Sequence, residues 1–148
     1  MSLSCIFPFT DLTARLPARP WADAPARAPM AAIFILSGIG KAGSFAAAQA
    51  YTQAFDLPGF LLLPTIVFEI GAGLGILVGF RTRLFAVLLA GFSLVTAFIF
   101  HADFSNQMQR IMFLKNVAMA GGFLMLARVG APGPSADQFH AYAAAGAD

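Results

Sequence analysis

Residues 60–83 read FLLLPTIVFEIGAGLGILVGFRTR, an apolar run that ends at a glycine and two arginines. A bilayer core of about 30 Å is crossed by about 20 mostly apolar residues in a helix. Backbone groups in lipid must be satisfied within the segment, so the run is predicted to be a helix rather than a strand. The following GFRTR, residues 79–83, leaves room only for a tight turn. Gly79 suits a helix end and Thr82 suits the cap of the next helix.

The composition of the whole chain agrees with a membrane protein. Of its 148 residues, 59% are hydrophobic and only 11% are charged, whereas soluble domains carry about 25% charged residues. A net charge of +2, spread along the chain, gives no reason to expect a nucleic-acid partner. The single cysteine, Cys5, excludes an internal disulfide or a Cys-x-x-Cys redox pair. No pattern of ligand residues predicts a metal site.

Four apolar segments are predicted to span the membrane. They cover about 30–48, 60–79, 83–101 and 109–128, and short connections make neighbouring spans antiparallel. The fold class is therefore all-α, a polytopic four-transmembrane-helix antiparallel bundle formed by residues 29–129. Residues 1–28 and 130–148 are expected to be terminal tails.

The arginines predict the orientation of this bundle. Three precede the first span, two lie between the second and third, and one follows the fourth: Arg15, Arg19, Arg27, Arg81, Arg83 and Arg128. With an even number of spans all six fall on one side, which the positive-inside rule assigns to the cytoplasm. Both termini are expected to be cytoplasmic, and the lipid bilayer is the first expected partner.

Five polar side chains are predicted to gather in the outer half of the bundle. Counting 1.5 Å per residue places Lys41 ~12 Å and Glu69 ~14 Å below the outer face, on consecutive antiparallel spans. The same count places Lys115 and Asn116 at ~9 to 10 Å and His101 at ~3 Å. Ionisable groups at such depth should face the bundle interior and pair, and Lys41 with Glu69 is the natural pair. These five residues form the candidate binding site.

Two interpretations of the charged pair stay open. An ion pair between two spans can form part of a binding pocket, or it can only fix the register of the helices. Gly38 and Gly73, about one turn from the charged residues, either permit close helix approach or leave room for a ligand. The stretch FILSGIGKAGSF, residues 34–45, is not a phosphate loop, because the glycine upstream and the hydroxyl residue after the lysine are both missing.

The stretches FILSGIGKAGSF, LPTIVFEIGAGLGILVGFRTR, FH at 100–101 and MFLKNVAMAGGFLML resemble the DoxX family of small bacterial membrane proteins. The resemblance covers about residues 30–128 and includes Lys41, Glu69, His101, Lys115 and Asn116 in the family's order. It implies a multi-pass protein of the bacterial inner membrane.

The resemblance also implies a function. A relative, DoxD, is a membrane subunit of a thiosulfate:quinone oxidoreductase, so redox-enzyme partner subunits and a non-covalently bound quinone are expected, with no covalently bound cofactor. A homo-oligomer is the other expected assembly. The alternative is a non-catalytic scaffold or assembly factor whose buried charges are structural. A transporter is less expected, because four spans leave little room for alternating access.

Overall fold

Helices form the part of the chain that the computed structural model describes, residues 20–139, with side chains from residue 24 onward. In chain order the elements are α2 (Pro20–Gly43), α3 (Phe45–Gln53), the 3-10 turn η2 (Gly59–Leu61), α4 (Leu62–Val78), α5 (Thr82–Phe100) and α6 (Gln107–Val129). A last helical turn covers 136–139. No strand occurs within this range, so the predicted all-α class is confirmed. The remainder of the predicted tails, 1–19 and 140–148, lies outside the described residues.

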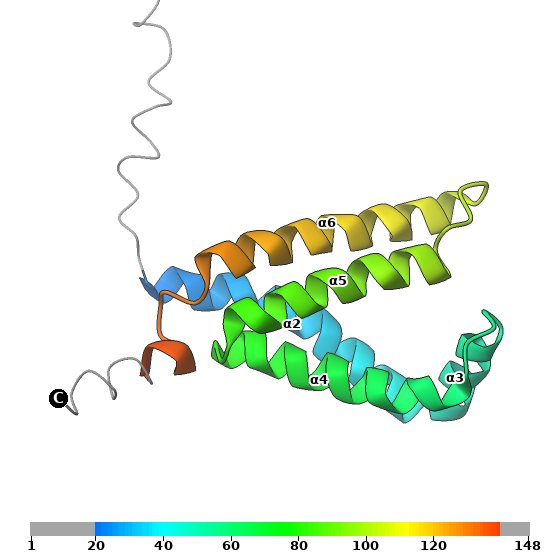
Figure 1. Ribbon diagram of the computed structural model, residues 1–148, viewed down its shortest axis with the longest axis horizontal. Coiled ribbons are helices and arrows are strands. Elements are labelled where there is room, and N and C mark those ends of the chain that lie inside the picture. Colours follow the sequence, from blue (N-terminus) through cyan, green and yellow to red (C-terminus); the bar gives the residue numbers. More distant parts are fainter. Residues whose placement is uncertain (1–19, 140–148) are drawn as a thin grey trace, which may run out of the picture.

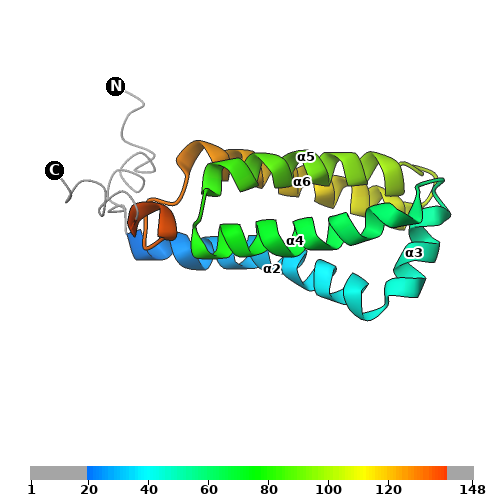
Figure 2. The ribbon, with the colours of Figure 1, turned by 60° about the horizontal axis from the view of Figure 1, so that its bottom comes forward.

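The long helices form two packed pairs. Helix α2 packs along α4, and α5 packs along α6, with a smaller contact between α4 and α5. Figure 2 shows these pairs as two layers, and Figure 1 shows that successive long helices run in alternate directions. Phe34 and Phe123 join the layers, with ring centroids 5.4 Å apart in an edge-to-face contact. Around this contact the buried core consists of alanines together with Ile76 and Leu89.

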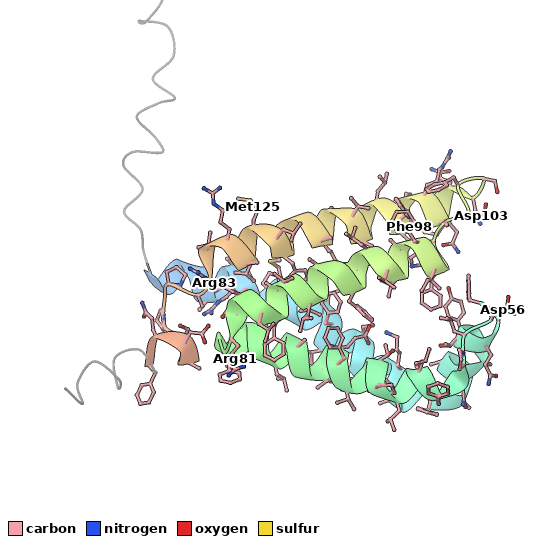
Figure 3. All side chains as sticks on the ribbon, viewed as in Figure 1. Asp56, Arg81, Arg83, Phe98, Asp103 and Met125 are labelled. Atoms are coloured by element: carbon pink, nitrogen blue, oxygen red, sulfur yellow. The ribbon has the colours of Figure 1, made fainter. Side chains whose placement is uncertain are left out.

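Three helical segments are long and apolar enough to cross a membrane: 59–78, α5 and α6. Helices α2 and α3 add a fourth only if the two, bent by 100° at their junction, count as one broken span. The structure thus supports a membrane protein with three or four spans. Figure 3 shows Asp56 and Asp103 at one end of the bundle and Arg81 and Arg83 at the other. The direction of insertion, with both termini in the cytoplasm, stays a prediction.

Helix α2 begins ten residues before the first predicted span. Pro20 occupies its first position, where the missing N–H of proline is not needed. The helix continues through Pro25 and Pro29, although proline is unfavourable inside a helix. Arg27, which the sequence suggested lies in a tail, is 2% exposed and donates from Nη2 to the carbonyl of Pro134 at 3.1 Å. Tertiary packing therefore outweighs the local preference here.

The first predicted span, 30–48, also runs across a break that the sequence did not reveal. Helix α2 ends at Gly43, and Ser44 leaves the helical conformation with φ −123° and ψ 46°. The Ser44 hydroxyl donates to the carbonyl of Gly40 at 2.8 Å, a bond that competes with the regular backbone ladder and bends helices. The chain then turns into α3 across the end of the bundle (Figure 1).

The turn between α4 and α5 is as tight as predicted, but its cap differs. Gly79 has φ +71°, and the Phe80 amide donates to the Gly75 carbonyl at 2.8 Å, which closes α4 as a Schellman motif. Thr82 is the first residue of α5 and does not cap it. The acceptor comes instead from Asp137, in the segment that the sequence assigned to a tail.

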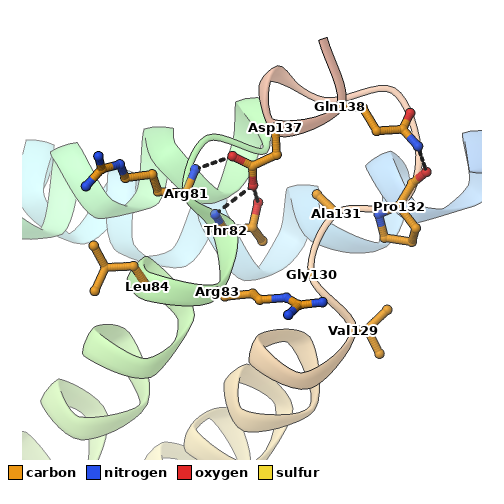
Figure 4. Close-up of a pocket in the computed structure, with 10 residues that line it drawn as sticks. All are labelled: Arg81, Thr82, Arg83, Leu84, Val129, Gly130, Ala131, Pro132, Asp137 and Gln138. Atoms are coloured by element: carbon orange, nitrogen blue, oxygen red, sulfur yellow. Dashed lines mark hydrogen bonds between the residues drawn. The ribbon is translucent and has the colours of Figure 1, made fainter. Parts of the chain in front are cut away.

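Asp137 binds the beginning of α5 with both carboxylate oxygens. Oδ1 accepts from the Arg81 amide at 2.7 Å, and Oδ2 accepts from the Thr82 amide and hydroxyl at 3.0 Å each (Figure 4). Partial burial raises the pKa of the Asp137 carboxyl, but the hydrogen bonds from Thr82 and Arg81 together lower it by a larger amount. The net pKa therefore lies below its usual value. The described part of the carboxy-terminal segment is thus docked on the α4–α5 turn, beside a cavity of about 620 Å³.

Candidate functional site

Lys41 and Glu69 form an ion pair between α2 and α4. Lys41 Nζ lies 2.7 Å from Glu69 Oε2 and 2.8 Å from Oε1, so it contacts both carboxylate oxygens. Ser37, one turn before Lys41, accepts a hydrogen bond from Nζ at 2.6 Å, and its own hydroxyl lies 3.4 Å from Oε1. Glu69 has a 4% exposed side chain, whereas Lys41 is 32% exposed. The carboxylate is therefore buried in the bundle, and the ammonium lies at the edge of the buried region.

Two glycines explain how α2 and α4 come close enough for this pair. A Cβ added at Gly38 would lie 2.6 Å from Cγ1 of Ile70, and one added at Gly73 would lie 2.7 Å from Cγ1 of Ile35. Both distances are shorter than side chains tolerate without movement. Of the two roles considered for these glycines, the structure shows close helix approach.

A third glycine of α4, Gly75, lies against a neighbouring helix. A Cβ there would be 2.5 Å from the ring of Phe85 in α5. Gly71, one turn earlier, has open space where a Cβ would lie, so only one of these two glycines is needed for packing.

A cavity of about 540 Å³ opens beside the ion pair, between the two helical layers. All five residues of the candidate binding site line it: Lys41, Glu69, His101, Lys115 and Asn116. This volume lies within the range of small-molecule sites, about 300–1,000 Å³. Most of its remaining wall is apolar, with Phe34, Phe92 and Met119 among the lining residues.

Of these five side chains, only Lys41 and Glu69 form a hydrogen bond or ion pair with one another. His101 follows the last turn of α5, and its Nδ1 lies 2.7 Å from Oε1 of Gln109. Asn116 is buried and donates from Nδ2 to the carbonyl of Met112 at 3.0 Å. Lys115 is exposed, is one of the residues that line the cavity, and forms no hydrogen bond or ion pair with the residues that the structure describes. None of the described residues donates a hydrogen bond to the side-chain oxygen of Asn116.

Helix α3 closes one end of the cavity with aromatic rings. Tyr51 stacks on Phe100 with ring centroids 5.7 Å apart, and Phe55 contacts the same ring edge-on at 5.0 Å. Tyr51 and Phe100 both line the cavity. The contribution of Tyr51 was missed in the sequence, because its ring reaches the site only through the bend at Ser44. Ser37 was also missed, although its position four residues before Lys41 places both on one helix face.

The chemistry available at the cavity is acid–base and hydrogen-bond chemistry. Ammonium, carboxylate, imidazole and amide groups line it together with aromatic faces. Within the described range, no three His, Cys, Asp or Glu side chains lie close enough to hold a metal ion.

Comparison with known proteins agrees with these features. The sequence profile of the DoxX family matches residues 22–102, more than half of the chain. The chain belongs to the DoxX family. The matched range contains Lys41, Glu69 and His101, while Lys115 and Asn116 lie beyond it.

Two relatives come from Escherichia coli strain K12. Inner membrane protein YqjF is 45% identical over 113 residues, which cover 76% of this chain and 87% of the relative. Inner membrane protein YphA is 35% identical over 128 residues, covering 82% and 91%. No solved structure matches the chain significantly. The predicted localisation of this DoxX protein, as a multi-pass inner-membrane protein, is confirmed by these relatives and by its apolar helices.

Proposed function

We propose that this DoxX protein is a subunit of a redox membrane complex and that its cavity binds a quinol-like or small anionic ligand. The observation that carries the proposal is that five polar side chains, from α2, α4, α6 and the end of α5, line one largely apolar cavity. An apolar cavity with a few convergent polar groups is the usual form of a small-molecule site.

Each polar residue has a role in this proposal. Lys41 and Lys115 supply positive charge and hydrogen bonds to a ligand oxygen, and Glu69 acts as counter-ion or proton acceptor. His101 and Asn116 form the rim. Ionisable groups inside a membrane bundle are expensive to keep and commonly serve function, which supports this assignment. Electron carriers would come from partner subunits, because the sequence shows no motif for an electron carrier.

Ligand binding to the purified full-length protein tests this function. Ubiquinone and thiosulfate binding would be measured in lipid discs for the native chain and for Lys41→Met and Glu69→Gln. We expect each variant to weaken binding of at least one ligand about tenfold or more. If both variants bind as the native chain does, or if the native chain binds neither, the pocket assignment is wrong.

The ion pair also favours a second candidate, a scaffold or assembly factor without ligand chemistry. Lys41 and Glu69 connect α2 and α4, which also approach each other closely at Gly38 and Gly73. In this case, replacing both charged residues by apolar ones should preserve folding and the recovery of native partner subunits by affinity purification and mass spectrometry. Loss of the partners from a folded double variant would count against the scaffold.

A further inference from the structure

The charges along the cavity do not balance. Two lysines and one glutamate line it, and Glu69 is fully engaged by Lys41 through both carboxylate oxygens. The other acidic side chains that the structure describes lie elsewhere: Asp103 accepts from Ser105, Asp137 caps α5, and Asp56 does not line the cavity. Two lysines against one glutamate leave one positive charge in excess among these side chains, and that charge is Lys115.

The position of Lys115 makes this charge significant. It lies eight residues after the start of α6, so its Cα is ~12 Å along a helix that is long and apolar enough to span the membrane. A lone ammonium at such depth is unfavourable unless an anion or water accompanies it. Neighbouring Asn116 cannot neutralise it, because an amide carries no charge.

The apolar wall of the cavity indicates that the accompanying anion must also have an apolar part. Phe34 and Phe92 meet edge-to-face, with centroids 6.1 Å apart, and apolar lining residues extend from them toward α3. A small inorganic anion would leave this surface uncovered. A volume of about 540 Å³ suits one chain or one ring system rather than a two-chain phospholipid.

We propose that the cavity binds an amphipathic monoanion, such as a single-chain carboxylate, whose charged group pairs with Lys115 and whose apolar part lies along Phe34 and Phe92. This inference rests on the proposed ligand pocket and narrows its ligand to the charged class. In this narrower form of the proposal Lys115, rather than Lys41, pairs with the charge of the ligand, because the Lys41 ammonium is already bound to both oxygens of Glu69. The Lys41–Glu69 pair then stays intact and forms a polar part of the wall.

A fluorescent pair of probes tests the inference on the full-length protein in phosphatidylcholine discs. The acid 11-(dansylamino)undecanoate carries the charge at pH 8, and its methyl ester does not; empty discs correct for partition into lipid. The acid should bind the native chain at least tenfold more tightly than the ester. Lys115→Met should remove that preference, whereas Arg110→Met, which removes an exposed cation of α6 outside the cavity lining, should preserve it.

The outcomes separate this inference from the proposed pocket. Val95→Trp, which fills the cavity from its lining, should weaken both probes. If Val95→Trp weakens both probes but acid and ester bind equally, the charge inference is overturned and the pocket stands. If Lys115→Met and Arg110→Met reduce acid binding equally, the attraction is a general surface effect and the inference is again overturned. If Val95→Trp changes neither probe, both proposals fail.

Discussion

Replacing Lys41 by methionine keeps the apolar length of the side chain but removes the ammonium that neutralises Glu69. The carboxylate is 4% exposed, and the hydroxyl of Ser37, at 3.4 Å, is the remaining described donor near it. Removing one partner of a buried ion pair costs about 3–5 kcal/mol. Because the Lys41 side chain is 32% exposed, the pair is not fully desolvated, and we expect the lower end, about 3 kcal/mol. This corresponds to a roughly hundredfold shift in the folding equilibrium.

Glu69→Gln should be milder, although it removes the same pair. The orphaned ammonium keeps Ser37 at 2.6 Å and already reaches the edge of the site, so the expected loss is about 1–2 kcal/mol. The double variant Lys41→Met/Glu69→Met leaves no buried charge and should lie within about 1 kcal/mol of the native stability. The two sites are therefore expected to be strongly non-additive.

Unfolding by sodium dodecyl sulfate in mixed micelles, followed by helical circular dichroism, measures these free energies. Arg110→Met, which removes an exposed cation from α6, is the matched control and should change stability by less than about 0.5 kcal/mol. A double variant whose loss equals the sum of the single losses would refute the coupling. An equal loss for the two single variants would refute the asymmetry that we derive from their exposures.

Three further predictions concern packing, the cap of α5 and orientation. Gly73→Ala should destabilise the protein by about 1–3 kcal/mol, since its methyl group meets α2, whereas Gly71→Ala has open space and should be neutral or stabilising in the same unfolding assay. Asp137→Asn should cost about 1 kcal/mol of cap stability and speed amide exchange at the start of α5. Because the pKa of Asp137 is lowered, the native cap contributes its full stability above the ordinary aspartate pKa, about 3.9. This stability is lost as pH falls through the lower pKa of the folded state. If acidification already speeds amide exchange at the start of α5 near neutral pH, this prediction is contradicted. Orientation is tested with Ser105→Cys and Arg128→Cys, each made in a chain whose single native cysteine is replaced. An impermeant maleimide added outside intact cells should label Ser105→Cys and should not label Arg128→Cys. The reverse pattern would show that the topology is inverted.

Three of the long helices could be predicted from the sequence to within two residues. Helices α4, α5 and α6 depend on local signals, namely apolar runs separated by a tight glycine turn or a polar loop. The first helix could not be predicted in this way. Its early part is bound through Arg27 to Pro134, a contact 107 residues apart, and its break coincides with a local hydrogen bond from the Ser44 hydroxyl to Gly40.

The sequence predicted those features of the candidate site that depend on how deep each residue lies along its membrane span. Counting residues along antiparallel spans placed Lys41 opposite Glu69, and the structure joins them by an ion pair. The same count brought Lys115 and Asn116 to the cavity that the pair borders. The rings of α3 could not be located, because a 100° bend has no signature in a hydropathy pattern.

The cap of α5 shows the same limit at the opposite end of the bundle. Thr82 carries a good local capping signal, but the first amides of α5 bind Asp137 from a segment rich in alanine, glycine and proline. Local sequence preference cannot reveal an acceptor that comes from 55 residues further along the chain. It is the docking of the carboxy-terminal segment that decides the cap.

An experimental density map of the full-length protein in lipid discs, at a resolution that shows side chains, tests the central claim most directly. We expect the Lys41 ammonium within hydrogen-bond distance of the Glu69 carboxylate, and elongated density that begins at Lys115 and follows Phe92 between the helical layers. A map in which Lys41 points into lipid, or in which side chains close the space between the layers, would contradict a ligand site at this position.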